Sequence, residues 1–204
     1  MINGNRMKSD RKRSPRDFYE TPIELAISAM NNFALDEGVL YKSMYGLDAG
    51  CGRGIWGLAN VSMPNKLTDG IDLKISDIIG RYAYVNVYEQ DFLDFHSVVG
   101  YDIIFGNPPY SLAEEFIRHA LELVNKDGYV YFLLRLSFLE GINRGDDLFK
   151  KYPPKRVYVS SRRPSFFSTN GRHTTDTLAY AMFLWQDNYM AKPEIDFLDW
   201  EYDK

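Results

Sequence analysis

Short apolar runs recur along the chain and predict the strands of a sheet. Residues 45–49, 101–105 (YDIIF) and 129–136 (YVYFLLRL) are almost continuously apolar instead of alternating with polar residues. Such runs are typical of strands that are buried on both faces of a parallel sheet. Weaker runs predict four more strands, at residues 67–73, 83–88, 156–160 and 177–185.

Helices are expected between these strands. The first begins at the stretch TPIE, because Thr21 can cap it, Pro22 suits its first position and Glu24 can complete a capping box. A short helix is expected at 55–60. An amphipathic helix is predicted over 112–125, where apolar residues recur at helical spacing.

This alternation of strands and helices predicts an α/β, Rossmann-like fold. Its seven-stranded sheet should be mostly parallel, with helices on both faces. Only a loop, residues 161–176, joins the last two strands, so we expect them to pair antiparallel at the sheet edge. Residues 1–16 are polar and basic and predict a flexible leader. Residues 17–204 are then expected to form one domain.

Composition narrows the class of protein. Cys51 is the single cysteine, which excludes an internal disulfide and a cysteine-cluster metal site. His96, His119 and His173 lie far apart and show no metal-ligand spacing. No apolar run is long enough to span a membrane, and the polar N-terminus does not resemble a secretory signal. We therefore expect a cytoplasmic protein without a metal or a membrane partner.

The distribution of charge bears on the partner. The net charge of −4 argues weakly against nucleic acid binding, but six of the 24 Lys and Arg residues lie in the leader and six more lie within 150–163. Such clusters can neutralise phosphates whatever the total charge is. The alternative is a solvated tail plus a basic surface loop.

Candidate chemistry follows the first predicted strand. In an open parallel sheet, ligands bind beyond the carboxyl ends of the strands. The stretch LDAGCGRG contains Gly50, Gly52 and Gly54, which let the backbone turn tightly and approach a ligand closely, although such a turn can also simply connect two elements. It differs from the dinucleotide pattern GxGxxG. The preceding Asp48 can hold a cationic amino group and would repel a phosphate.

Acidic residues follow the next two strands. Asp72 ends the second, where a carboxylate can accept hydrogen bonds from both hydroxyls of a ribose. Asp91 follows the third and can accept from an adenine amino group, while Phe92 can pack against the base. Each of these aspartates could instead merely cap a turn. Their order, one at each successive strand end, favours a nucleoside-binding site.

The tetrapeptide Asn107-Pro108-Pro109-Tyr110 follows the fourth strand. Its prolines fix a rigid turn. The side-chain oxygen of Asn107 and the backbone carbonyl of Pro108 can both accept hydrogen bonds from one –NH₂ group. This favours pyramidal nitrogen and frees its lone pair to attack a methyl group, without any strongly basic side chain. Tyr110 offers a flat face to a planar substrate.

Together these motifs resemble the class I, S-adenosylmethionine-dependent, adenine-N6 DNA methyltransferases, especially small phage-type members. LDAGCGRG is similar to their cofactor glycine loop, GIDLK to the ribose-binding acid, QDF to the cofactor-adenine contact and NPPY to the catalytic tetrapeptide. The stretch DFYETP, with Tyr19, Thr21 and Pro22, is similar to the segment that touches the methionine part of the cofactor. The stretch RPSFF resembles a C-terminal signature, which implies that Phe166 or Phe167 lies near the substrate pocket.

The resemblance implies a class I methyltransferase fold, S-adenosylmethionine as cofactor and a DNA adenine that is flipped out of the stack and held against Tyr110. It also implies a location in the cytoplasm, that of the host if a phage encodes the chain. Larger relatives carry a separate target-recognition domain, and only 94 residues follow Tyr110 here. Specificity is therefore expected to be loose, or to come from the basic loop with Arg162 and Arg163, from a dimer mate or from another protein. The chain is expected to be a monomer or a weak homodimer.

Three alternatives remain open from the sequence. The same chemistry can act on adenine or guanine in RNA, because the amino group is the same. It can also act on a protein glutamine, although such enzymes usually carry an N-terminal helical substrate domain. The third alternative is a non-catalytic subunit that binds the cofactor or nucleic acid.

Overall fold

The computed structural model of the chain describes residues 20–75, 80–167, 173–175 and 177–201. The predicted leader and Tyr19 lie outside these ranges. Within them, no helix combines the length and the apolar character needed to cross a bilayer.

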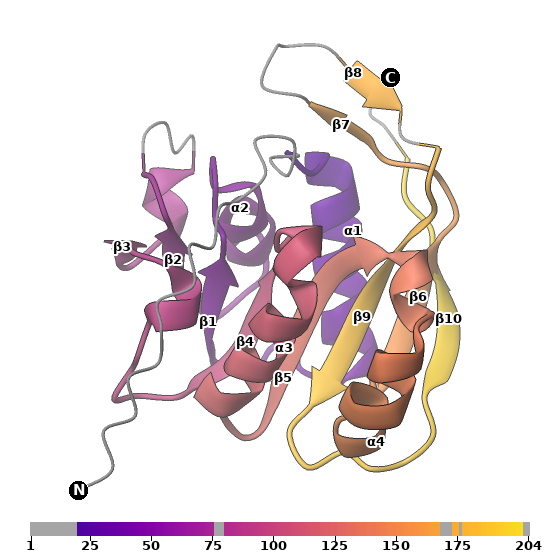
Figure 1. The fold of residues 1–204 in the computed structure, drawn as a ribbon. Helices are drawn as coiled ribbons and strands as arrows, with labels where there is room; N and C mark the ends of the chain where they lie inside the picture. The colour runs from indigo at the N-terminus through magenta and orange to yellow at the C-terminus, as the bar shows by residue number, and fades with distance from the viewer. Residues whose placement is uncertain (1–19, 76–79, 168–172, 176, 202–204) are drawn as a thin grey trace, which may run out of the picture.

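One eight-stranded sheet forms the centre of the fold (Figure 1). Its strands are β1 (Met44–Ala49), β2 (Lys66–Asp72), β3 (Val87–Glu89), β4 (Tyr101–Gly106), β5 (Val124–Arg135), β6 (Arg156–Ser160), β9 (Tyr180–Gln186) and β10 (Glu194–Leu198). They lie in the order β10-β6-β9-β5-β4-β1-β2-β3. β9 runs antiparallel to β5 and β6, and the other pairs are parallel. A separate two-stranded ribbon consists of β7 (Ser165–Phe167) and β8 (His173–Thr175).

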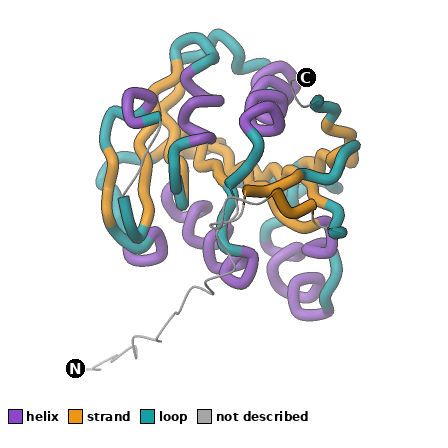
Figure 2. Tube along the Cα trace, turned by 90° about the horizontal axis from the view of Figure 1, so that it is seen from above, coloured by secondary structure: helices purple, strands orange, loops and turns teal. Residues whose placement is uncertain are grey.

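Helices cover both faces of the sheet, as Figure 2 shows from above. The helices are α1 (Ile23–Asp36), α2 (Ile55–Val61), α3 (Ala113–Leu123) and α4 (Phe149–Lys151). Shorter helical turns lie at Arg81–Ala83, Phe92–Asp94, Tyr110–Leu112, Leu136–Leu139 and Arg144–Leu148. Ile103 and Phe105 of β4 pack with α1 and α2, whereas Ile104 between them packs with α3. Burial on both faces explains the continuous apolar runs.

The prediction of a mostly parallel α/β sheet is confirmed, but the count and the edge differ. Seven strands were expected, and β10 is an eighth; its stretch EIDFL alternates charged and apolar residues and is largely exposed. The predicted antiparallel pairing of the strands at 156–160 and 177–185 is confirmed by β6 and β9, but β9 lies between β5 and β6 instead of at the edge. Almost every residue of β9 is buried, as a strand with neighbours on both sides requires.

The predicted capping box of the first helix is wrong. α1 begins at Ile23 and its cap residue is Pro22, whose side chain makes no capping hydrogen bond. The hydroxyl of Thr21 instead accepts a hydrogen bond from the indole nitrogen of Trp56 in α2, at 3.2 Å. A long-range contact has therefore taken the side chain that local rules assign to the cap.

Candidate active site at the carboxyl ends of the strands

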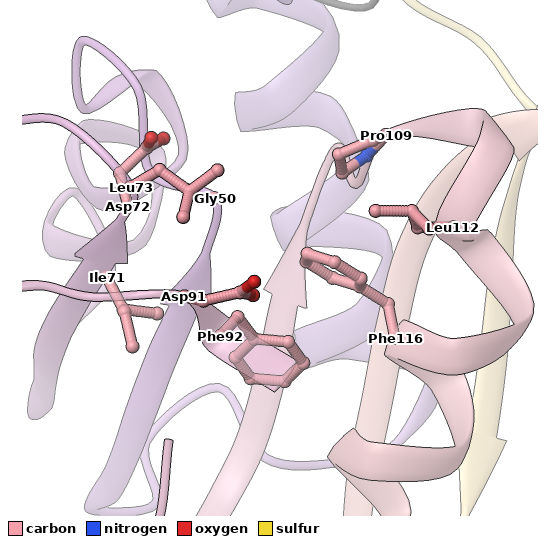
Figure 3. A pocket seen from close by; sticks show the side chains of 9 residues that line it. All are labelled: Gly50, Ile71, Asp72, Leu73, Asp91, Phe92, Pro109, Leu112 and Phe116. Carbon is pink, nitrogen blue, oxygen red and sulfur yellow. The ribbon is translucent and has the colours of Figure 1, made fainter. Parts of the chain in front are cut away.

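The carboxyl ends of β1, β2 and β4 meet at one edge of the sheet, and a pocket lies there. The backbone amides of Gly50 and Cys51 donate to the carbonyl of Ile71, at 2.8 and 2.9 Å, which joins the glycine loop to β2. The pocket is lined by Gly50, Ile71, Asp72, Leu73, Asp91, Phe92, Pro109, Leu112 and Phe116 (Figure 3). Residues from all four predicted strand-end motifs therefore line the same pocket.

The glycine loop has the backbone that its sequence predicts. Gly50, Gly52 and Gly54 adopt φ angles of 81°, 50° and 92°, a region that side chains rarely occupy. The amide of Gly52 donates to Oδ2 of Asp72 at 2.9 Å. This bond connects the first motif to the second across 20 residues of sequence.

Asp72 lies at the end of β2, largely buried, with its carboxylate at the rim of the pocket. Its Oδ1 also accepts from the amide of Lys74 at 3.3 Å. Each carboxylate oxygen has two lone-pair sites, so both can accept further hydrogen bonds. Two adjacent hydroxyl groups are suitable donors for a carboxylate held in this way.

Asp91 and Phe92 form the opposite side of the pocket. Oδ1 of Asp91 accepts from the amide of Leu93 at 2.9 Å, and the carboxylate lies toward the cavity in Figure 3. The ring of Phe92 packs on Phe116 of α3 with their centroids 4.7 Å apart. An acceptor beside an apolar wall suits a flat heterocycle that carries an amino group.

Asp48 does not line this pocket. It is fully buried behind the glycine loop, and its Oδ2 accepts a 2.6 Å hydrogen bond from the Tyr84 hydroxyl. Burial raises the pKa of Asp48 to about 7; the bond from Tyr84 opposes the rise and the charge of Asp72 adds to it. Because Asp48 is not among the residues that line the pocket, its contact with a ligand amino group stays a prediction.

Tyr84 is the residue of this region that sequence reasoning missed. Its ring packs closely on two glycines: a Cβ added at Gly57 would lie 2.3 Å from its Cζ, and one at Gly70 would lie 3.0 Å from its Cε1. The sequence offers a weak signal, a glycine inside the short helix α2, where glycine is otherwise unfavourable.

The tetrapeptide begins directly beside the pocket. Nδ2 of Asn107 donates to Oγ1 of Thr21 at 3.3 Å, and Pro109 contributes to the pocket wall. Thr21 and Pro22 lie next to the tetrapeptide and not among the residues that line the pocket. The rigid Pro108-Pro109 turn is followed by a helical turn that begins at Tyr110.

Tyr110 is more enclosed than its predicted stacking role suggests. The guanidinium of Arg135, at the end of β5, lies over its ring at 4.8 Å from the centroid. Burial raises the pKa of the Tyr110 hydroxyl well above its usual value; the neighbouring Tyr180 adds to the rise, whereas Arg135 and Asn107 oppose it. One face of the ring is therefore covered, so a base would have to use the opposite face or displace Arg135.

Of the two phenylalanines in the C-terminal signature, Phe166 has a described side chain. Phe166 is fully buried and packs edge-on against Tyr180, with centroids 5.0 Å apart. Tyr180 in turn packs against Tyr110 at 5.7 Å. Phe166 thus supports the tetrapeptide from the core, one ring behind it. The side chain of Phe167 lies outside the described residues.

The basic stretch 150–163 is largely neutralised by carboxylates. The ion pairs are Lys150–Asp146, Lys151–Asp147, Lys155–Glu37, Arg156–Asp36, Arg156–Glu194 and Arg162–Glu201. Arg163 is exposed and has no ion pair within the described part of the chain. The stretch is therefore a charge-balanced surface and not a continuous positive patch.

Comparison of the sequence with protein-family models and with curated proteins finds no match. Solved structures share the fold. A candidate RNA methyltransferase from Pyrococcus horikoshii matches over 89% of this chain and 93% of its own, with a TM-score of 0.67 and 15% sequence identity. A predicted O-methyltransferase from Agrobacterium tumefaciens matches over 88% and 87%, with a TM-score of 0.58 and 13% identity.

A third structure carries a ligand. The 1,6-didemethyltoxoflavin-N1-methyltransferase from Burkholderia thailandensis, with bound S-adenosylhomocysteine, matches over 81% of this chain and 80% of its own, with a TM-score of 0.57 and 12% identity. The chain thus has the Rossmann-like class I methyltransferase fold, which confirms the predicted fold class.

Proposed function

We propose that this protein is an S-adenosylmethionine-dependent methyltransferase that acts on the 6-amino group of adenine in DNA. One observation carries the proposal: Pro109 of the tetrapeptide lines the same pocket as Asp72, Asp91 and Phe92. A site suited to a nucleoside and a group suited to gripping an amine therefore adjoin. The cofactor and the substrate amine would meet at that junction.

The pocket residues fit the nucleoside part of the cofactor. Asp72 would accept from the ribose hydroxyls, and Asp91 would accept from the adenine amino group. Ile71, Phe92 and Phe116 supply apolar surface for the faces of the ring. S-adenosylmethionine, when bound, supplies a methyl group activated by its sulfonium.

Asn107 and Pro108 would act on the substrate nitrogen. The lone pair of an aromatic amine is delocalised into the ring, which makes it a poor nucleophile. Two carbonyl acceptors that hold its hydrogens favour the pyramidal form and orient the lone pair toward the methyl group. Their dipoles also stabilise the positive charge that develops on the nitrogen.

The choice of adenine in DNA rests on the resemblance of Asn107–Tyr110 and of the strand-end motifs to adenine-N6 DNA methyltransferases. The fold alone does not select this substrate. Of the structures with the same fold, one is named an RNA methyltransferase, one an O-methyltransferase and one a methyltransferase of a small heterocycle. The enclosed Tyr110 would stack on the flipped base through the face opposite Arg135.

The test is transfer of labelled methyl groups to duplex DNA, single-stranded DNA, RNA and a protein extract, with the product nucleosides and residues separated. N6-methyladenine in DNA that disappears with Asn107→Ala is the expected result. Label in RNA or in protein glutamine would keep the chemistry and change the substrate. Cofactor binding without transfer to any substrate would contradict the proposal and favour a binding subunit.

A further inference from the structure

Two hydrogen bonds converge on the hydroxyl oxygen of Thr21. The indole nitrogen of Trp56 donates to it at 3.2 Å, and Nδ2 of Asn107 donates to it at 3.3 Å. Thr21 and Trp56 are almost wholly buried, at 4% and 3% exposure. The three residues come from the segment before α1, from α2 and from the turn after β4, so only the tertiary fold brings them together.

The chemistry of the three groups fixes the direction of these bonds. The indole N–H of tryptophan and the amide nitrogen of asparagine act only as donors. A hydroxyl oxygen, in contrast, can accept two hydrogen bonds. Trp56 occupies one acceptor position of Thr21 and Asn107 occupies the other. The two ends of an asparagine amide have nearly the same shape, so only such partners determine which end faces which way.

We infer that Thr21, itself held by Trp56, is a positioning residue for Asn107. By binding the amide nitrogen it turns the carbonyl oxygen of Asn107 away from α1, toward the amine to be methylated. The inference rests on the proposed function of Asn107 and adds two residues to it. It also gives Thr21 a role in orienting the side-chain oxygen of Asn107 that accepts from the substrate, in place of a helix cap or a cofactor contact.

Other uses of Thr21 account less well for these contacts. A helix cap would accept a hydrogen bond from an amide of the first turn of α1, but the cap residue of that helix is Pro22, and Thr21 accepts from Trp56 and Asn107 instead. A cofactor contact would need an exposed side chain, whereas Thr21 is almost wholly buried. Burial of its hydroxyl between two donors is what an orienting group requires.

The first experiment separates orientation from binding. Thr21→Val keeps the shape and removes the acceptor, and Thr21→Ser restores the acceptor as the matched control. We expect kcat for methyl transfer to fall about tenfold in Thr21→Val and to stay near the wild-type value in Thr21→Ser. The Kd for S-adenosylmethionine, measured by calorimetry, should change less than about threefold in both. In the Asn107→Ala background, Thr21→Val should have no further effect on residual transfer.

A second experiment needs neither cofactor nor substrate. The side-chain amide protons of Asn107, assigned by their loss in Asn107→Ala, should exchange slowly in the NMR spectrum of the full chain. Thr21→Val should accelerate that exchange, Thr21→Ser should preserve it, and Trp56→Phe should accelerate it partially. This last variant also serves if Thr21→Val does not fold.

The outcomes separate the two proposals. An unaltered kcat and an unaltered Asn107 amide signal in Thr21→Val would overturn the positioning role, as would a loss of cofactor affinity with kcat unchanged. Absence of methyl transfer by the wild-type protein would instead overturn the proposed function, and the amide signal would still report whether Thr21 holds Asn107.

Discussion

The Tyr84 hydroxyl donates a 2.6 Å hydrogen bond to the buried carboxylate of Asp48. Asp48 is the last residue but one of β1, just before the glycine loop, and Tyr84 follows a helical turn that precedes β3. The ring of Tyr84 lies against Gly57 and Gly70, so it joins α2 and β2 to the base of the loop. The shape of the pocket floor therefore depends on a residue that does not line it.

Stability should fall as pH rises through neutrality because of Asp48. Burial raises its pKa from 3.8 to about 7, so the folded state holds the proton more tightly than the unfolded state. This contribution is fully present below pH 3.8 and is lost as pH rises through about 7. A shift of this size corresponds to an upper bound of about 4 kcal/mol. Urea unfolding at pH 5 and pH 8 should show the loss in wild type and not in Asp48→Asn; parallel behaviour of the two proteins would contradict it.

Gly57→Ala should destabilise the protein by about 2 kcal/mol or more. The new Cβ would lie 2.3 Å from Cζ of the buried Tyr84, so the ring or the helix must move. Gly145→Ala is the control, because a Cβ there meets nothing within 4 Å. Thermal unfolding of both variants checks the difference, and equal midpoints would show that the contact between α2 and Tyr84 is looser than described.

Replacement of Asp72 should weaken cofactor binding, whereas replacement of Asn107 should slow turnover. Asp72→Ala removes the acceptor of the Gly52 amide and the proposed ribose ligand, so the Kd for S-adenosylmethionine should rise about tenfold or more. Asn107→Ala should leave that Kd nearly unchanged while kcat falls about a hundredfold. Calorimetry and transfer assays measure the two quantities. Wild-type affinity in Asp72→Ala would contradict the ribose assignment.

Salt dependence should separate the two basic segments. Lys150 and Lys151 are paired with Asp146 and Asp147, so their replacement by glutamine should leave the slope of DNA affinity against salt almost unchanged. Deletion of residues 1–16, which carry six Lys and Arg residues, should make that slope shallower. Fluorescence anisotropy over a salt series measures both, and the reverse pattern would assign phosphate contact to the 150–163 stretch.

The strand-end residues were predictable because parallel strands bring their carboxyl ends to one edge whatever the connections between them. Asp72, Asp91 and Pro109 line one pocket for this reason. Asp48 differs because its partner, Tyr84, is 36 residues away and no local pattern announces the contact. The same holds for Thr21. A capping rule considers only nearby residues, so it cannot predict the hydrogen bond from Trp56, 35 residues further along the chain.

The cluster of cations at 150–163 did not predict the ion pairs that the fold gives it. The cations of 150–163 meet acids from α1, from the turn before α4 and from the C-terminal end of the described chain. The cations lie close together in the sequence, whereas the carboxylates that pair with them lie far apart. Only the fold shows that they neutralise one another.

The position of β9 between β5 and β6 bears on how the chain is made. In the described part of the chain, β6 pairs only with β9 and β10, and both follow it in the sequence. While the chain emerges from the ribosome, β6 therefore has no partner until residues 180–198 have been synthesised. The last segments to appear join the two parts of the sheet, so a nascent chain that stalls before them would expose an apolar strand edge to its neighbours.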